Sequence, residues 1–192
     1  MAKYYLAVDI GASSGRLILG HLENGKMELE EVHRFENGMV KKDGELCWEF
    51  DRLFKEIKNG LKKCKEIGKI PVSMGVDTWG VDFVLMDKDD KVLGNTVGYR
   101  DHRTEGMDEE VYKIISLEDL YARTGIQKAI FNTVYQLMAV KKKHPEYLEQ
   151  AETCFTYRII STISSQARRP ASTQRQLPDS WLALRQRIGT TN

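Results

Sequence analysis

A carboxylate followed by a run of small residues stands near the start of the chain. Asp9 closes an apolar, β-prone stretch, and the segment GASSGR comes after it at residues 11–16. In such a segment backbone N–H groups can approach phosphate oxygens, serine hydroxyls add donors, and Arg16 adds positive charge. Asp9 would hold Mg²⁺ directly or through water. These residues therefore indicate a metal-phosphate site, although a Gly/Ser hairpin with a capping aspartate also accounts for them.

A second cluster, GVDTWGVDF at residues 75–83, places two acids around an aromatic side chain. Asp77 and Asp82 flank Trp79 and Gly80 where a buried strand meets a loop. Acids accept hydrogen bonds from sugar hydroxyls, and an aromatic ring covers the apolar C–H faces of a sugar. The cluster indicates a sugar site. The alternative is a turn in which Trp79 belongs to the core and both acids are solvated.

Two further segments carry weaker signals. YRDHRT at residues 99–104 combines two arginines, an aspartate and a histidine, which fits either a polar ligand or an internal knot of ion pairs. His102 has no nearby Cys or His partner, so we do not interpret it as a metal ligand. Gln127 and Asn132 stand among apolar residues in GIQKAIFNTVYQL (125–137), where they would face a cleft or serve as local caps.

The elements that must position these residues follow from the apolar periodicity. Three strands joined by two turns, the second at Asn24-Gly25, predict an antiparallel meander over residues 5–10, 16–22 and 27–32. Apolar residues at helical spacing, with Lys and Glu opposite, predict a helix over residues 49–67. Later strands are expected up to Asp77, at 81–86 and at 92–99, and later helices at 108–115, 117–124 and 131–143.

This order predicts an α/β chain with a sheet of mixed type. It is not the uniform βαβ alternation of a doubly wound dinucleotide fold, and GASSGR is neither G-x-G-x-x-G nor a Walker loop. The 192 residues carry a net charge of +1, which gives no reason to expect a nucleic acid or a membrane surface as partner. The three cysteines lack metal or disulfide spacing, and no apolar run approaches the ~20 residues of a membrane span. We therefore expect a cytoplasmic protein.

The chain resembles the rhamnulokinases, a branch of the FGGY family of carbohydrate kinases, in the segments AVDIGASSGR, HRFENG, GVDTWGVDFVLMD, YRDHRT, LYARTGIQ and FNTVYQL. They occur in the family's order and cover nearly all of residues 5–152. The resemblance implies an actin-like, ribonuclease-H-like mixed sheet with flanking helices, in two domains with the active site in the cleft between them. It also implies Mg²⁺-dependent transfer of the γ-phosphate of ATP to the 1-hydroxyl of L-rhamnulose.

The resemblance also assigns roles by position. Asp9 matches the acid that helps to hold the metal-nucleotide, and the ATP-phosphate loop falls on Ala12, Ser13, Ser14, Gly15 and Arg16. Gly80 matches a sugar-contacting glycine, surrounded by Asp77, Trp79 and Asp82. The family's catalytic base lies in a His-Asp-Thr segment, which these residues do not contain. We therefore expect an inactive fragment in which residues 1–153 are the N-terminal part of the first kinase domain; a non-catalytic actin-like module that binds nucleotide or sugar is the alternative.

The composition changes after residue 153. Residues 154–192 contain no Lys and no Glu, and their only acid is Asp179. Read in another frame, with free choice of synonymous codons, this stretch permits strings that resemble the family's continuation in order. We therefore expect residues 154–192 to be an out-of-frame, disordered tail without function. A genuine basic linker or a nucleic-acid arm is the alternative.

Overall fold

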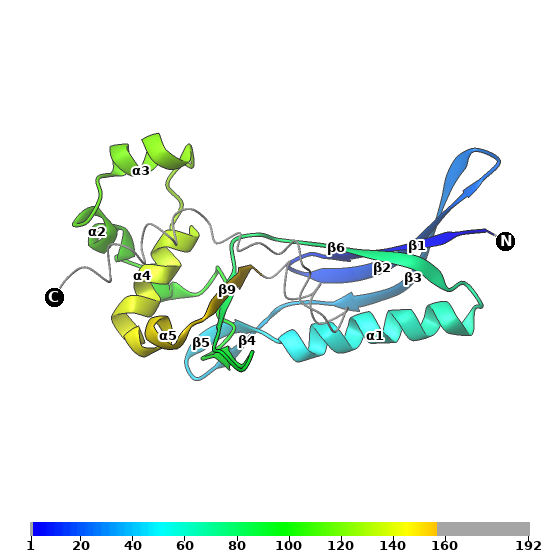
Figure 1. Ribbon diagram of the computed structural model, residues 1–192, viewed down its shortest axis with the longest axis horizontal. Coiled ribbons are helices and arrows are strands. Elements are labelled where there is room, and N and C mark those ends of the chain that lie inside the picture. The colour runs from blue at the N-terminus through cyan, green and yellow to red at the C-terminus, as the bar shows by residue number, and fades with distance from the viewer. Residues whose placement is uncertain (1, 157–192) are drawn as a thin grey trace. The chain divides into compact units, whose positions relative to one another are not determined.

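The computed structural model describes residues 2–156, which form two compact units (Figure 1). Residues 2–40 and 48–80 make the first unit, and residues 41–47 and 81–156 make the second. Within this part of the chain, no helix has the length and apolar composition needed to cross a membrane. The expected tail lies outside the described residues, apart from residues 154–156.

The first unit is built on a four-stranded sheet in the order β3-β2-β1-β6. β1 (Tyr4–Ile10), β2 (Ser14–Glu23) and β3 (Lys26–Glu36) pair antiparallel in sequence order, which confirms the predicted meander. Asn24 (φ 49°) and Gly25 (φ 79°) both take the left-handed conformation that a tight hairpin turn requires. β6 (Pro71–Thr78) adds to the other side of β1 in parallel, so the sheet is of mixed type, as predicted.

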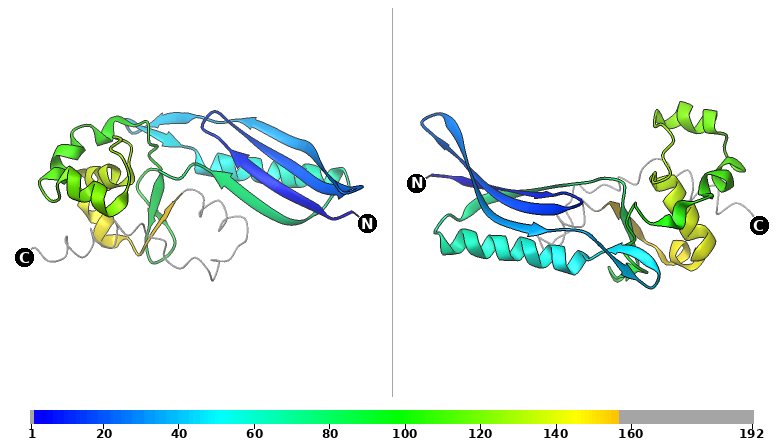
Figure 2. Two further views of the ribbon diagram at one scale, coloured as in Figure 1. Left: turned by 90° about the horizontal axis from the view of Figure 1, so that it is seen from above. Right: turned by 180° about the vertical axis from the view of Figure 1, so that it is seen from behind.

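One long helix, α1 (Phe50–Glu66), lies along one face of this sheet (Figure 2). Its buried side chains include Leu53, Ile57 and Cys64, and the strands contribute alternate residues to the same core, namely Leu6, Val8, Ile10, Leu17 and Leu19. The packing is close, because a Cβ on Gly60 would lie 2.4 Å from Leu17 Cδ2. Side chains on the opposite face of the sheet are exposed, for example Leu29 at 69%.

The second unit combines a three-stranded sheet with short helices. The sheet has the order β8-β7-β9, with β7 (Phe83–Met86) between β8 (Val92–Leu93) and β9 (Thr153–Thr156). The helices are the 3₁₀ turn η1 (His102–Thr104), α2 (Met107–Tyr112), α3 (Leu117–Thr124), α4 (Thr133–Lys143) and α5 (Pro145–Gln150). Phe83, Leu85, Leu137, Val140, Ala151 and Cys154 form its main apolar cluster.

The structure differs from the sequence prediction in three places. A short two-stranded sheet, β4 (Met39–Lys42) with β5 (Glu45–Trp48), was not predicted, and neither were α5 and β9. The strand expected at 92–99 is reduced to β8, because Gly94 (φ 72°) takes the left-handed conformation and interrupts it. The boundary expected between Thr153 and Cys154 falls inside β9, which pairs antiparallel with β7.

Candidate functional site

Asp9 and Asp77 lie side by side at one end of the first unit's sheet. Each is the last but one residue of its strand, and the parallel register of β1 and β6 pairs Asp9 with Asp77. The antiparallel register on the other side of β1 pairs Asp9 with Arg16. Three charged residues therefore form a row across three adjacent strands, at the carboxyl ends of the parallel pair. Ligands of open α/β sheets bind at such ends.

Arg16 forms an ion pair within this row. Its Nε donates to Asp9 Oδ2 at 2.8 Å, and the two side chains are 45% and 43% exposed. Water screens so exposed a pair, which therefore contributes at most about 1 kcal/mol. The Arg16 guanidinium can consequently exchange Asp9 for another anion at small cost.

A second arginine, Arg34 on β3, extends the row because its register partner on β2 is Arg16. Arg34 Nε donates to Glu31 Oε1 at 3.0 Å, and this hydrogen bond lowers the pKa of Glu31. Sequence reasoning assigned no role to Arg34, although it lies in the HRFENG segment. The row thus carries two guanidinium groups beside two carboxylates.

The segment between β1 and β2 is a tight turn. Gly11 N donates to Ser14 O at 2.9 Å, and Asn37 N, just after β3, donates to Ser13 O at 2.9 Å. The backbone N–H groups of Ala12 and Ser13 donate to no acceptor within residues 2–156. Ser13 is exposed and Ala12 is half-buried, so these N–H groups lie where water or a ligand can satisfy them.

Residue 15 packs so closely against Phe35 that no side chain larger than that of glycine fits there. A Cβ at this position would lie 2.1 Å from Phe35 Cζ and 2.6 Å from Cε2. Gly15 is buried, and Phe35 on the neighbouring strand β3 is only 8% exposed. The described contacts therefore explain this glycine by side-chain packing. Its assignment to the ATP-phosphate loop stays a prediction.

Trp79 and Gly80 follow β6 directly. The Trp79 ring packs on Trp48 with centroids 4.3 Å apart and planes at 38°, and Trp48 is 3% exposed. Trp79 itself is half-buried, so it has both a core contact and an accessible part. A Cβ on Gly80 would meet nothing within 4 Å. The packing therefore does not require glycine at this position, and its assignment to the sugar site stays a prediction.

Asp82 belongs to the second unit, whereas the other residues predicted for the two sites belong to the first. It is 0% exposed, and Gln136 Nε2 lies 3.5 Å from its Oδ1. The same Nε2 donates to Phe131 O at 2.9 Å and to Val81 O at 3.1 Å. The alternative in which both acids of the second cluster are solvated is therefore wrong for Asp82.

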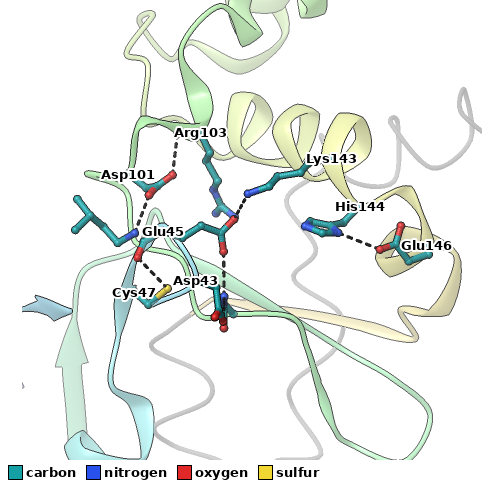
Figure 3. Close-up of polar contacts among 10 residues, drawn as sticks. Asp43, Glu45, Cys47, Asp101, Arg103, Lys143, His144 and Glu146 are labelled. Atoms are coloured by element: carbon teal, nitrogen blue, oxygen red, sulfur yellow. Dashed lines mark hydrogen bonds and ion pairs between the residues drawn. The ribbon is translucent and has the colours of Figure 1, made fainter. Parts of the chain in front are cut away.

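The YRDHRT segment forms an internal network in the second unit (Figure 3). Asp101 accepts a hydrogen bond from Leu46 N at 2.7 Å and another from Arg103 N at 2.8 Å. Arg103 Nη2 donates to Gln136 Oε1 at 2.7 Å. Burial lowers the pKa of Arg103, against the charges of Asp101, Asp82 and Glu45, which raise it. These contacts favour the knot over the polar ligand.

A hollow of about 430 Å³ borders this network, lined by Glu45, Arg103, Lys143, His144 and Tyr147 among others. Glu45 accepts from Lys143 Nζ at 2.8 Å and from Asn95 Nδ2 at 3.1 Å. Partial burial raises the pKa of Glu45, but these two hydrogen bonds and the nearby positive charges lower it overall. Glu45 and Lys143, two of the charged residues that line the hollow, are thus paired with each other.

The two polar residues of GIQKAIFNTVYQL are placed differently. Asn132 is the N-cap residue of α4, and its Nδ2 donates to Gln127 O at 2.9 Å. The Gln127 side chain is exposed. Asn132 is thus a cap by position alone, because its side chain makes no capping hydrogen bond to α4. Gln136, which sequence reasoning did not single out, is the buried polar residue of this segment, at 1% exposure.

Comparison with known proteins places the chain among carbohydrate kinases. Residues 4–166 match the model of the FGGY family of carbohydrate kinases, N-terminal domain. The chain is 58% identical over 151 residues to a rhamnulokinase of Halalkalibacterium halodurans, which covers 79% of this chain and 32% of that protein. It is 53% identical to a rhamnulokinase of Oceanobacillus iheyensis, again over 79% of this chain and 32% of that protein. The chain thus spans about a third of the length of these curated relatives.

Solved structures show the same fold at low sequence identity. A gluconate kinase from Lactobacillus acidophilus superposes with a TM-score of 0.72 at 16% identity, over 85% of this chain and 33% of that one. A xylulose kinase from Rhodospirillum rubrum superposes with a TM-score of 0.72 at 17% identity, over 87% of this chain and 35% of that one. The expected fold class, a mixed sheet of the actin-like type with flanking helices, is therefore confirmed.

Proposed function

The chain belongs to the FGGY family of carbohydrate kinases, and on this basis we propose that it carries the ATP-phosphate loop of a rhamnulokinase. The reaction would be transfer of the γ-phosphate of ATP to the 1-hydroxyl of L-rhamnulose, in the cytoplasm. Support comes from curated relatives that bear this name at up to 58% identity. The observation that carries the proposal is the turn at residues 11–14, where two N–H groups without an acceptor among the described residues lie beside a row of charged side chains.

The candidate site residues would have distinct tasks. The backbone N–H groups of Ala12 and Ser13, the hydroxyls of Ser13 and Ser14, and the Arg16 guanidinium would bind phosphate oxygens. Arg16 is suited to this because its pair with Asp9 is weak and exposed. Asp77, Trp79 and Gly80 would contact the sugar. The resemblance gives the same task to Asp82, which belongs to the second unit and is 0% exposed.

The acids of the row fit Mg²⁺. Asp9 and Asp77 offer hard carboxylate oxygens on neighbouring strands. Within the described residues no group of three or more ligating side chains is present, so phosphate oxygens and water would complete the coordination, as is usual for Mg²⁺. When bound, the ion would neutralise charge on the transferring phosphoryl group.

A non-catalytic binding module is the second candidate, and one observation favours it. The sequence contains no His-Asp-Thr segment, in which the family's base would lie. We therefore propose that this chain binds its ligands without turnover. A coupled phosphorylation assay with L-rhamnulose and Mg-ATP tests this point, and robust turnover would show that the chain supplies its own base.

Isothermal titration of the full chain with Mg-ATP tests the phosphate loop. We expect measurable binding, weakened at least about tenfold in Arg16→Gln, because a charge-assisted hydrogen bond is worth roughly 1.5–3 kcal/mol. Arg123→Gln, an exposed arginine of α3 in the second unit, is the matched control and should bind as the wild type does. Absence of binding by the wild type, or equal binding by Arg16→Gln, would refute the assignment.

For residues 154–192 we propose an out-of-frame origin, supported by the loss of Lys and Glu after Thr153. Resequencing the DNA across codons 150–156 tests this proposal directly. An uninterrupted frame that encodes the same residues in independent isolates would argue for a genuine basic segment instead.

A further inference from the structure

Asn37, the first residue after β3, contacts both sides of the turn between β1 and β2. Its backbone N donates to Ser13 O at 2.9 Å, and its side-chain Nδ2 donates to Gly11 O at 2.8 Å. One residue from a different strand end therefore binds two of the carbonyl groups of the turn.

These two bonds fix the direction of the neighbouring N–H groups. In a planar trans peptide the C=O of one residue and the N–H of the next point in opposite directions. Because Asn37 holds the Gly11 carbonyl, the Ala12 N–H points away from Asn37. Because Asn37 also holds the Ser13 carbonyl, the Ser14 N–H points away in the same manner. The carbonyl oxygens, which would repel a phosphate, face Asn37 instead.

The Asn37 side chain is itself held in one orientation. Its Oδ1 accepts from Gly38 N at 2.9 Å and from Arg52 Nη2 at 3.2 Å, which leaves Nδ2 for the turn. Arg52, in the first turn of α1, is anchored in two further ways. Its Nη1 donates to Glu36 O at 2.9 Å and its Nε to Glu49 Oε2 at 3.0 Å. The helix thus transmits its position to the turn through Arg52 and Asn37.

We propose that Asn37 is a positioning residue for the ATP-phosphate loop, and that Arg52 orients Asn37. Asn37 acts by holding the carbonyls of Gly11 and Ser13, so that the Ala12 N–H, one of the two assigned to the phosphates, points away from Asn37. This inference rests on the proposed function of the turn. It adds two residues, neither of which would touch the nucleotide.

The test compares Asn37→Ala and Arg52→Lys with a matched control, Asn59→Ala. Asn59 is a half-buried asparagine of α1 whose Nδ2 lies 3.4 Å from Glu56 Oε2, and it makes no contact with the turn. Isothermal titration with Mg-ATP should show binding about threefold to tenfold weaker in Asn37→Ala, the equivalent of one hydrogen bond. Arg52→Lys, which keeps the charge, should lie between, and Asn59→Ala should match the wild type.

Amide NMR separates positioning from general stability. Asn37→Ala removes the Nδ2 bond to Gly11 O and keeps the backbone bond to Ser13 O. We therefore expect the Ala12 amide signal to move in Asn37→Ala without ligand, and its Mg-ATP-induced shift to shrink. Thermal midpoints of Asn37→Ala and Asn59→Ala should stay comparable. Wild-type affinity in Asn37→Ala, or an unmoved Ala12 signal, would overturn the inference. A wild-type chain that does not bind Mg-ATP would overturn the proposed function alone, and the amide signals would then still decide whether Asn37 positions the turn. If Asn37→Ala does not fold, the same two measurements on Arg52→Lys test the inference.

Discussion

Replacing Gly15 by alanine would separate two explanations of this glycine, close approach to phosphate and packing against Phe35. The added Cβ would come within 3.0 Å of three ring atoms of Phe35, the nearest at 2.1 Å. The ring is 8% exposed and lies in the core of the first unit, so it cannot simply swing into water. Overpacking of this kind costs about 1–3 kcal/mol, and three simultaneous clashes place Gly15→Ala near the upper end.

Urea denaturation of the chain measures this cost, and a double-mutant cycle assigns it. Phe35→Leu removes the clashing ring atoms, so Gly15→Ala should cost at least about 1 kcal/mol less in that background than in the wild type. Gly75→Ala in β6 is the control, because a Cβ there meets nothing within 4 Å, and it should change the free energy of unfolding by less than about 0.5 kcal/mol. If Gly15→Ala leaves stability unchanged but abolishes Mg-ATP binding, the packing explanation is refuted and phosphate approach is the reason for the glycine.

Three other outcomes follow from the same contacts. Burial raises the pKa of the Cys154 thiol to about 12, so the thiol should react with a disulfide reagent at pH 8 far more slowly in the folded chain than in urea, and equal rates would contradict its burial. Because the unfolded thiol ionises near ~8.5, this group makes folding less favourable as the pH rises above that value. Hydrogen bonds from Lys113 and Lys142 lower the pKa of Glu110 to about 2, so the stabilising contribution of Glu110 is present above its unfolded pKa of ~4.3 and lost as the pH falls toward 2. Carboxyl ¹³C NMR should show the lowered pKa of Glu110, and Lys142→Ala should raise it. A titration near ~4.3 in the wild type would exclude these bonds. Leu29 is 69% exposed on the sheet face opposite α1, so light scattering should show less self-association in Leu29→Lys than in the wild type, and no difference would mean that this face does not drive association.

Local signals in the sequence were sufficient for most of the first unit. The Asn24-Gly25 dipeptide and alternating apolar residues predicted the meander, and helical spacing predicted α1. The N-cap of α3 is equally local, since Ser116 Oγ accepts from Asp119 N at 3.1 Å. Such features depend on neighbours within a few residues, and propensity and periodicity report on that range.

Features that depend on distant pairing were missed. The register that sets Asp77 beside Asp9 joins positions 68 residues apart (77 − 9), and no local pattern specifies it. Asn37 was assigned no role, because its partners Gly11 and Ser13 lie far from it in the sequence. Asp82 was interpreted as part of a surface cluster because acids are seldom fully buried, yet it is 0% exposed beside Gln136.

The bonds that brace the turn all connect nearby parts of the chain. Asn37 reaches Gly11 across 26 residues, and Arg52 reaches Asn37 and Glu36 across 15 and 16. Loops of this length close rapidly and at modest entropic cost, and the N-terminal residues leave the ribosome first. The turn can therefore form while the second unit is still being synthesised. The change of reading frame that we propose after Thr153 would leave these bonds intact, because all of their partners lie between residues 11 and 52.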